Sequence, residues 1–225
     1  MINEKERKGG RMSSRKHQLH VITTGKQELP QLKELFEGCP TELIDVLHIR
    51  EKQRGAREVA EWYLGLEPYF PLSSIYINDR LDAALAVGAP GVQLGYTSLS
   101  VRASRGLLPS GVRIGCSVHS REEAAQAVEE GPDYVLFGHI FASGSKPGLE
   151  PRGLDALEAI VQACPLPVIA IGGMEPERVE EVAATGCAGI AVLSSILLHD
   201  RPAEQIVRFR EALDRTHYIP RRRFP

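Results

Sequence analysis

A histidine closes an apolar run in residues 133–141, which read Asp-Tyr-Val-Leu-Phe-Gly-His-Ile-Phe. The run predicts a buried strand ending at Gly138, with His139 at its C-terminal end. An imidazole in that position can accept and return a proton near neutral pH. A histidine among apolar residues is also commonly a structural core side chain. The segment therefore makes His139 a candidate acid–base residue, with a structural role as the alternative.

Polar side chains also follow other predicted strands. Arg50 and Lys52 follow the run 44–49 and could bind phosphate or carboxylate oxygens, although a solvated basic turn explains them equally well. Asn78 closes the run 74–78, where an amide usually meets a ligand or a neighbouring loop. The next residue, Asp79, is a good helix N-cap. Ser117 ends the run 113–117 with a hydroxyl.

The segment 142–148, Ala-Ser-Gly-Ser-Lys-Pro-Gly, combines hydroxyl groups, flexible backbone amides and one ammonium group. Ser143, Ser145 and Lys146 are its candidate ligand-binding residues, because such a loop suits an anion. An ordinary flexible surface loop has the same composition. The segment predicts anion binding only together with other features.

Two further loops predict a phosphate site. Gly172 and Gly173 follow the run 168–171 and precede a helix start. Leu193 ends the run 189–193, and Ser194 follows it. Glycine lets backbone N–H groups approach an anion, and a helix start adds positive potential. In (β/α)8 barrels the loops after strands seven and eight frequently bind phosphate. The expected ligand is therefore a small organic phosphate.

The elements that must position these residues are eight short apolar runs separated by helical patterns. Several runs are apolar on consecutive positions, as strands covered on both faces require. Ser120 and Glu123 match a capping box, and the helix that they open should stop at Gly131. Eight evenly spaced units predict an α/β protein with a single closed (β/α)8 barrel. The alternative is a doubly wound open sheet. The predicted strands are 19–23, 44–49, 74–78, 91–94, 113–117, 134–137, 168–171 and 189–193.

The 225 residues suit one catalytic domain, predicted at 18–217, between a disordered extension at 1–17 and a tail at 218–225. Met12 could be the functional start. The net charge of −2, from 27 basic and 29 acidic residues, favours no nucleic-acid partner. No stretch suits a membrane span or signal peptide. Four scattered cysteines form no zinc or disulfide pattern and indicate a reducing cytoplasm. Self-association is left open.

Several motifs together resemble the thiamine phosphate synthase superfamily in order and spacing, across residues 19–196. The resemblance implies a (β/α)8 barrel that binds phosphorylated precursors of thiamine. Any one motif alone would be unspecific. The motifs are residues 48–52, 77–86, 91–95, 115–120, 133–141, 170–174 and 189–194.

Within the superfamily, residues 117–120 and 134–141 are most similar to the thiazole tautomerases of the TenI type. This resemblance implies an isomerase that aromatises a carboxythiazole phosphate without a metal or organic cofactor. His139 would take a proton from ring carbon C2 and deliver one to the exocyclic carbon. Gly173 and Ser194 would hold the phosphate. The remaining expected substrate-binding residues are Arg50, Lys52, Asn78, Ser117, Ser143, Ser145, Lys146 and Leu193.

Two alternatives remain beside the tautomerase hypothesis. The synthases of the superfamily join a pyrimidine diphosphate to a thiazole phosphate, release diphosphate, and hold Mg²⁺ with two aspartates. Asp79 matches one aspartate, but Ser98 stands where the other is expected, which would weaken a Mg²⁺ site. His48 also stands where synthases usually have glutamine. The second alternative is a non-catalytic protein that binds thiazole phosphate or regulates through it.

Overall fold

The computed structural model describes residues 15–70, 75–144, 146 and 148–224. Eight parallel strands form a closed barrel in the order β1 to β8, each paired with its neighbours in sequence and β8 with β1. The prediction of a single (β/α)8 barrel is confirmed, and the open-sheet alternative is wrong. The strands are β1 Gln18–Ile22, β2 Val46–Ile49, β3 Ile75–Asn78, β4 Gly91–Leu94, β5 Arg113–Val118, β6 Tyr134–Gly138, β7 Val168–Ile171 and β8 Gly189–Val192.

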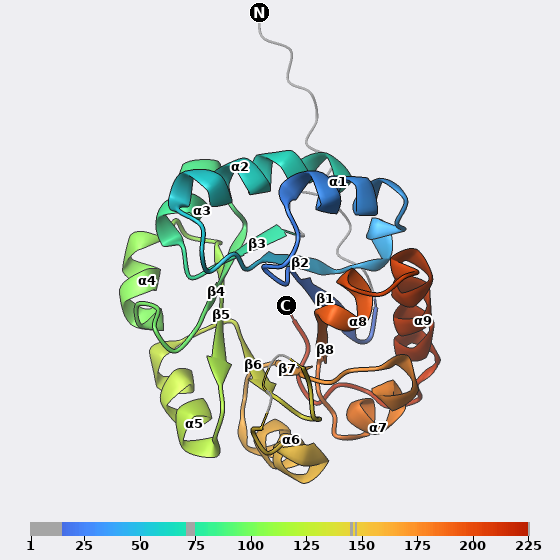
Figure 1. Ribbon diagram of the computed structural model, residues 1–225. Helices are drawn as coiled ribbons and strands as arrows, with labels where there is room; N and C mark the ends of the chain where they lie inside the picture. The colour runs from blue at the N-terminus through green and yellow to red at the C-terminus, as the bar shows by residue number, and fades with distance from the viewer. Residues whose placement is uncertain (1–14, 71–74, 145, 147, 225) are drawn as a thin grey trace, which may run out of the picture.

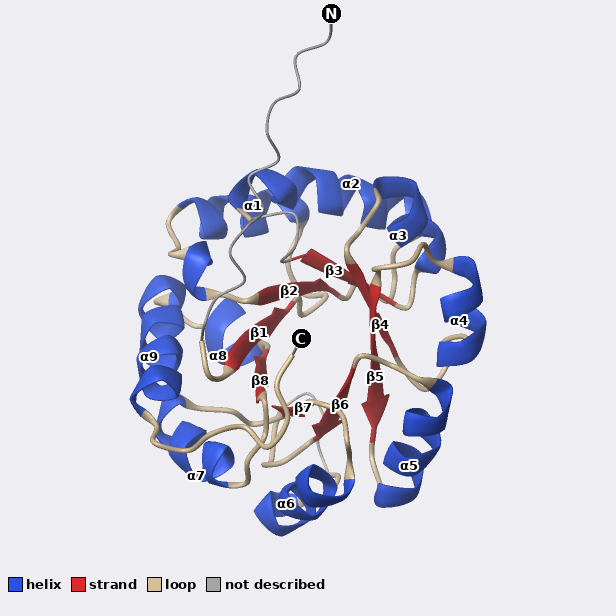
Figure 2. Ribbon diagram, turned by 180° about the vertical axis from the view of Figure 1, so that it is seen from behind, coloured by secondary structure: helices blue, strands red, loops and turns tan. Residues whose placement is uncertain are grey.

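Helices surround the barrel on the outside, as Figures 1 and 2 show from opposite sides. They are α1 Leu29–Glu37, α2 Ala56–Leu66, α3 Leu81–Val87, α4 Val101–Leu107, α5 Arg121–Glu130, α6 Gly153–Ala163, α7 Val179–Ala184, α8 Ser194–Leu197 and α9 Pro202–Arg215. Short 3-10 turns lie at Thr41–Leu43, Glu67–Tyr69 and Pro176–Arg178. Among the described residues, no helix is long and apolar enough to cross a membrane.

Helix α5 illustrates how local sequence sets the element ends. The Ser120 hydroxyl accepts the Glu123 amide at 3.1 Å, while the Glu123 carboxylate accepts the His119 amide at 2.7 Å. The helix ends at Gly131, whose φ of 78° lies in the left-handed region. Glycine adopts that conformation without steric cost. The predicted start and stop of this helix are confirmed.

The hydrophobic core has two layers. The larger layer lies between the strands and the helices, and the smaller one fills the barrel interior. Tyr76 and Tyr134 occupy much of the interior because glycines face them. A Cβ on Gly91 would lie 2.6 Å from the Tyr76 ring, and one on Gly115 would lie 2.2 Å from the Tyr134 ring.

The C-terminal segment returns to the barrel. The Arg221 amide donates to the Gly186 carbonyl at 2.9 Å, and the Phe224 ring lies 5.3 Å from the Tyr134 ring. Arg113, at the first position of β5, lies over the Phe224 ring. The chain end therefore lies within the ring of strands in both ribbon views, covering the end of the barrel where the strands begin (Figures 1 and 2).

The predicted extension 1–17 lies outside the described residues except for its last three. The Arg15 guanidinium forms an ion pair with Asp45 at 3.2 Å, and His17 is fully buried. The described chain is thus already packed against the barrel before β1 begins.

Candidate functional site

The loops after the strands surround one opening, which we call the mouth of the barrel. The parallel register aligns the strand ends, with Asn78 beside Gln93 and Ser117 beside Leu136. Residues predicted from separate strand ends consequently lie on a single rim. This is the end at which (β/α)8 enzymes carry their catalytic residues.

Four basic side chains gather at the mouth. Burial lowers the pKa of Lys146, and the positive charges of Arg152, Arg50 and Lys52 lower it further. Residues from the β2 and β6 loops are therefore close enough to repel one another electrostatically. We call Arg50, Lys52, Lys146 and Arg152 the mouth cations. A multiply charged anion bound among them would relieve their repulsion.

His139 lies under the β6 loop. Its side chain is 6% exposed, and its Nε2 lies 3.2 Å from the Leu149 carbonyl, which makes Nε2 the donor. Its Nδ1 has no hydrogen-bond partner within the described chain. The peptide between Gly138 and His139 is cis. Gly172 packs against this residue so closely that a Cβ there would lie 2.3 Å from the His139 Cβ.

The loops after β7 and β8 lie beside each other, as the predicted phosphate site requires. Gly173 has a φ of 63°, and a Cβ on it would lie 2.6 Å from the Ala142 carbonyl oxygen. The Ser195 hydroxyl donates to the Met174 carbonyl at 2.8 Å and joins the two loops. Ser194 is exposed at the first position of α8. Glycine is required at 173 both by its conformation and by the close approach of the β6 loop.

The remaining predicted binding residues differ in their surroundings. The Ser117 hydroxyl accepts a hydrogen bond from the Gln93 side-chain amide at 3.1 Å. Ser143 is half-buried in the β6 loop, and Leu193 packs against the interior core rather than standing free at the rim. Ser145 lies outside the described residues. Leu193 can therefore offer a ligand its backbone more readily than its side chain.

Asp79 makes contacts that differ from the expected helix cap. Its φ of 62° is left-handed, and its Oδ1 accepts hydrogen bonds from the Gly95 amide and the Ser98 hydroxyl. Its own amide donates to the Gln93 carbonyl at 3.0 Å. Helix α3 begins after Arg80, which has no side-chain cap bond. The N-cap interpretation of Asp79 is therefore wrong: the carboxylate links the β3 and β4 loops.

A buried chain of polar side chains that the sequence patterns did not predict lies below the mouth. His48 Nδ1 lies 3.3 Å from Asn78 Oδ1, and His48 Nε2 lies 3.0 Å from His20 Nδ1. His20 Nε2 lies 2.8 Å from Gln18 Oε1. The available signal was the spacing of His20 two residues after Gln18 in a strand, which puts both side chains on one face.

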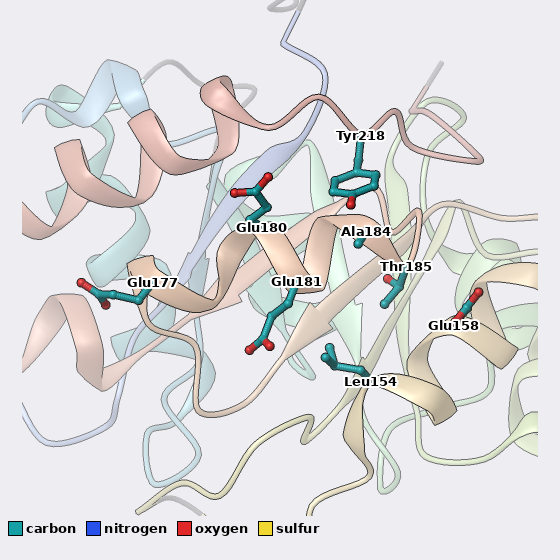
Figure 3. Close-up of a pocket in the computed structure, with 8 residues that line it drawn as sticks. All are labelled: Leu154, Glu158, Glu177, Glu180, Glu181, Ala184, Thr185 and Tyr218. Atoms are coloured by element: carbon teal, nitrogen blue, oxygen red, sulfur yellow. The ribbon is translucent and has the colours of Figure 1, made fainter.

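A surface groove of about 620 Å³ lies outside the barrel, among α6, α7 and the C-terminal segment (Figure 3). Several acidic side chains line it, the opposite sign to the mouth cations. One of them, Glu177, is already paired with Arg208. The groove is thus unsuited to the predicted organic phosphate. Its lining is Leu154, Glu158, Glu177, Glu180, Glu181, Ala184, Thr185 and Tyr218.

Comparison with known proteins identifies the family. Residues 19–196 match the family model described as thiamine monophosphate synthase. The chain belongs to the thiamine phosphate synthase family. It is 42% identical to the thiamine-phosphate synthase of Chlorobium phaeovibrioides over 72% of this chain and 81% of the relative. It is 36% identical to the Pyrococcus horikoshii synthase over 89% and 94% of the two chains. The solved thiamine phosphate pyrophosphorylase of Pyrococcus furiosus superposes with a TM-score of 0.74 at 32% identity, covering 88% and 96%.

The expectation of a TenI-type thiazole tautomerase is wrong, and so is the isomerase class. The relatives of this family member are named thiamine-phosphate synthases at identities of 36 to 42% over most of the chain. The Ser98 and His48 departures are single substitutions and do not outweigh that similarity.

The synthase family implies Mg²⁺, and Asp79 is the carboxylate expected to hold it. Asp79 Oδ1 already accepts two hydrogen bonds, one of them from Ser98. Among the described residues, no three His, Cys, Asp or Glu side chains are grouped as a metal site would need. The residues present do not fit a site with two carboxylate ligands. The only ligands for a hard cation at this position are the Asp79 carboxylate and the neighbouring Ser98 hydroxyl, within the described residues.

Proposed function

We propose that this protein is a thiamine phosphate synthase, a transferase that joins a pyrimidine diphosphate to a thiazole phosphate and releases diphosphate. The observation that carries the proposal is a pair of features at one mouth that suit anions. The mouth cations belong to the loops after β2 and β6, and the Gly173 turn and the start of α8 follow β7 and β8. Two such features suit two phosphorylated substrates.

The mouth cations have a specific part in this reaction. As the new bond to the thiazole forms, the bond to the diphosphate breaks and negative charge develops on the leaving group. Positive side chains held in place beforehand stabilise such charge more effectively than water does. Arg50 adds a planar set of donors, and Lys146 adds an ammonium group whose pKa is lowered by burial and by its basic neighbours.

The second anion-binding feature would hold the thiazole phosphate. Gly173 can let backbone N–H groups approach the phosphate, and Ser194 adds the amide of an exposed helix start. Asn78 at the end of β3 and Ser117 in β5 lie on the rim between β2 and β6 and would contact the substrates there. Their side chains are half-buried, so they are accessible to a ligand.

The test is to incubate the protein with the pyrimidine diphosphate and the thiazole phosphate together, and with each alone, with and without Mg²⁺. Diphosphate release that requires both substrates, with a coupled product of the expected mass, is the predicted result. Binding of both substrates without product under any condition would overturn the proposal and leave the non-catalytic alternative.

A further inference from the structure

A chain of four polar side chains runs through the barrel interior from the start of β1 to the mouth. It consists of Gln18, His20, His48 and Asn78, joined by contacts of 2.8, 3.0 and 3.3 Å. His20 and His48 are fully buried, and their rings lie 5.1 Å apart. Only the two amide ends are half-buried. The N–H groups of the two buried imidazoles must therefore find their hydrogen-bond partners within this chain.

The number of protons on the two imidazoles limits the direction in which the hydrogen bonds of this chain can run. Gln18 and Asn78 both turn their oxygens toward the imidazoles, so that both ends accept. Filling all three contacts then needs three protons on the two rings, which means one imidazolium. Burial opposes that charge: it lowers the pKa of His48 to about 4 and that of His20 well below its usual value. Two neutral rings carry two protons, so one terminal amide must turn and donate.

The two possible directions have opposite effects at the mouth. If Gln18 turns, His20 Nδ1–H donates to His48 Nε2, and His48 Nδ1–H donates to Asn78 Oδ1. The Asn78 NH2 group then points away from the chain. If Asn78 turns instead, it donates to His48 and leaves its oxygen pointing away. Within the described chain, the only hydrogen bond found for the Asn78 side chain is the one at its oxygen, so its nitrogen is available to a ligand.

The charge of the ligand decides between these two hydrogen-bond directions. The mouth cations indicate an anion, and a carboxamide oxygen facing phosphate oxygens is unfavourable, whereas an amide N–H is a good donor to them. We infer that His48 is a positioning residue, which donates from Nδ1 to Asn78 and thereby directs the Asn78 NH2 group toward an acceptor atom of the bound substrate. His20 fixes this tautomer from below.

The surroundings keep the pair isolated from water. The Tyr76 ring packs edge-on against His48, and the Tyr134 ring packs edge-on against His20. Phe224 covers His20 at 6.1 Å between ring centroids. Arg113 is the charged group whose field lowers the pKa of His20 further. Because no water competes for their protons, the buried His20 and His48 rings can each hold one tautomer.

The direct test is the tautomer of His48 in the unmodified protein, read from long-range ¹H–¹⁵N correlations of ¹⁵N-histidine-labelled chain. The expected spectrum has His48 and His20 both protonated on Nδ1. Protonation of His48 on Nε2 would overturn the inference. The exposed His217, replaced in His217→Leu, serves as the control for assignment and should leave the other signals unchanged. This measurement does not depend on any enzymatic activity.

A kinetic test rests on the proposed synthase function. Asn78→Asp keeps an acceptor for His48 but removes the NH2 group, so the His48 tautomer should persist while kcat/KM falls at least about tenfold. His48→Leu should cause a similar fall, with Asn78→Ala adding little to it, and His48→Gln should recover part of the loss. Additive losses from the two substitutions would contradict the inference. If the parent chain releases no diphosphate, the proposed function fails while the tautomer result still stands.

Discussion

The Ser98 hydroxyl donates a hydrogen bond to the Asp79 carboxylate across the rim between β3 and β4, and the Gly95 amide donates to the same oxygen. Asp79 is held in a left-handed conformation that, apart from glycine, asparagine and aspartate, few residues commonly adopt. The serine therefore takes up an oxygen that a metal ion would otherwise approach.

Replacing Ser98 by aspartate should create a site for a divalent ion. Ser98→Asp puts a second carboxylate next to Asp79, and hard cations prefer such oxygen ligands. We expect Mn²⁺ to bind at least about tenfold more tightly, which calorimetric titration measures without substrate. Ser98→Ala is the matched control, because it also removes the hydrogen bond but adds no ligand. Equal Mn²⁺ affinity in the aspartate and alanine variants would contradict this interpretation.

Removing a mouth cation should weaken binding of diphosphate. In Arg50→Gln or Lys146→Gln, a charge-assisted hydrogen bond worth about 1.5 to 3 kcal/mol is lost, which corresponds to roughly tenfold or more in Kd. Fluorescence or calorimetric titration with inorganic diphosphate gives the affinity. Lys33→Gln on the exposed side of α1 removes the same charge far from the mouth and should have little effect. A loss as large in Lys33→Gln would mean that net charge alone sets the affinity.

Acidification should destabilise the fold between about pH 6.5 and pH 4. Burial lowers the pKa of His17 and of His48 from 6.5 to about 4, so in this range the unfolded chain binds more protons than the folded one. Stability that is present above pH 6.5 is therefore lost as the pH falls, by about 1.4 kcal/mol for each unit of pKa depression. Urea unfolding at pH 7, 6 and 5 measures the slope. His48→Gln should flatten it, and an unchanged slope would assign the effect to other groups.

Adding a methyl group at Gly115 should destabilise the barrel. Its Cβ would lie 2.3 Å from Gln93 Oε1 and 2.2 Å from the Tyr134 ring, so the interior must shift. Gly115→Ala should cost about 1 to 3 kcal/mol of unfolding free energy. In Gly106→Ala nothing lies within 4 Å of the new Cβ, and α4 should gain about 0.5 to 1 kcal/mol. Similar midpoints of urea unfolding for both variants would contradict the close packing at Gly115.

The barrel itself was predictable because local signals agree with the global topology. Strands covered on both faces read as continuous apolar runs, and Gly131 marks a helix end by its left-handed conformation. Strand ends at one rim then follow from parallel closure. The closeness of the loops after β7 and β8 could be predicted for the same reason, since consecutive strands of the barrel end side by side.

The Asp79 and His48 contacts could not be predicted from the sequence. Asp79 has the composition of a helix cap, and its bond to Ser98 depends on how the β3 and β4 loops meet. The contact of His48 with His20 depends on the stagger between β1 and β2. The choice of enzyme class failed because motifs shared by a whole superfamily carry little information about one branch, whereas similarity along most of the chain does.

Phe224, at the far end of the chain, lies against the ring of His20 beneath the mouth. A chain end opens locally more often than the whole protein unfolds. The rate at which deuterium from the solvent enters the two histidine rings should therefore report on detachment of this segment. Detachment would then limit how fast solvent reaches the barrel interior.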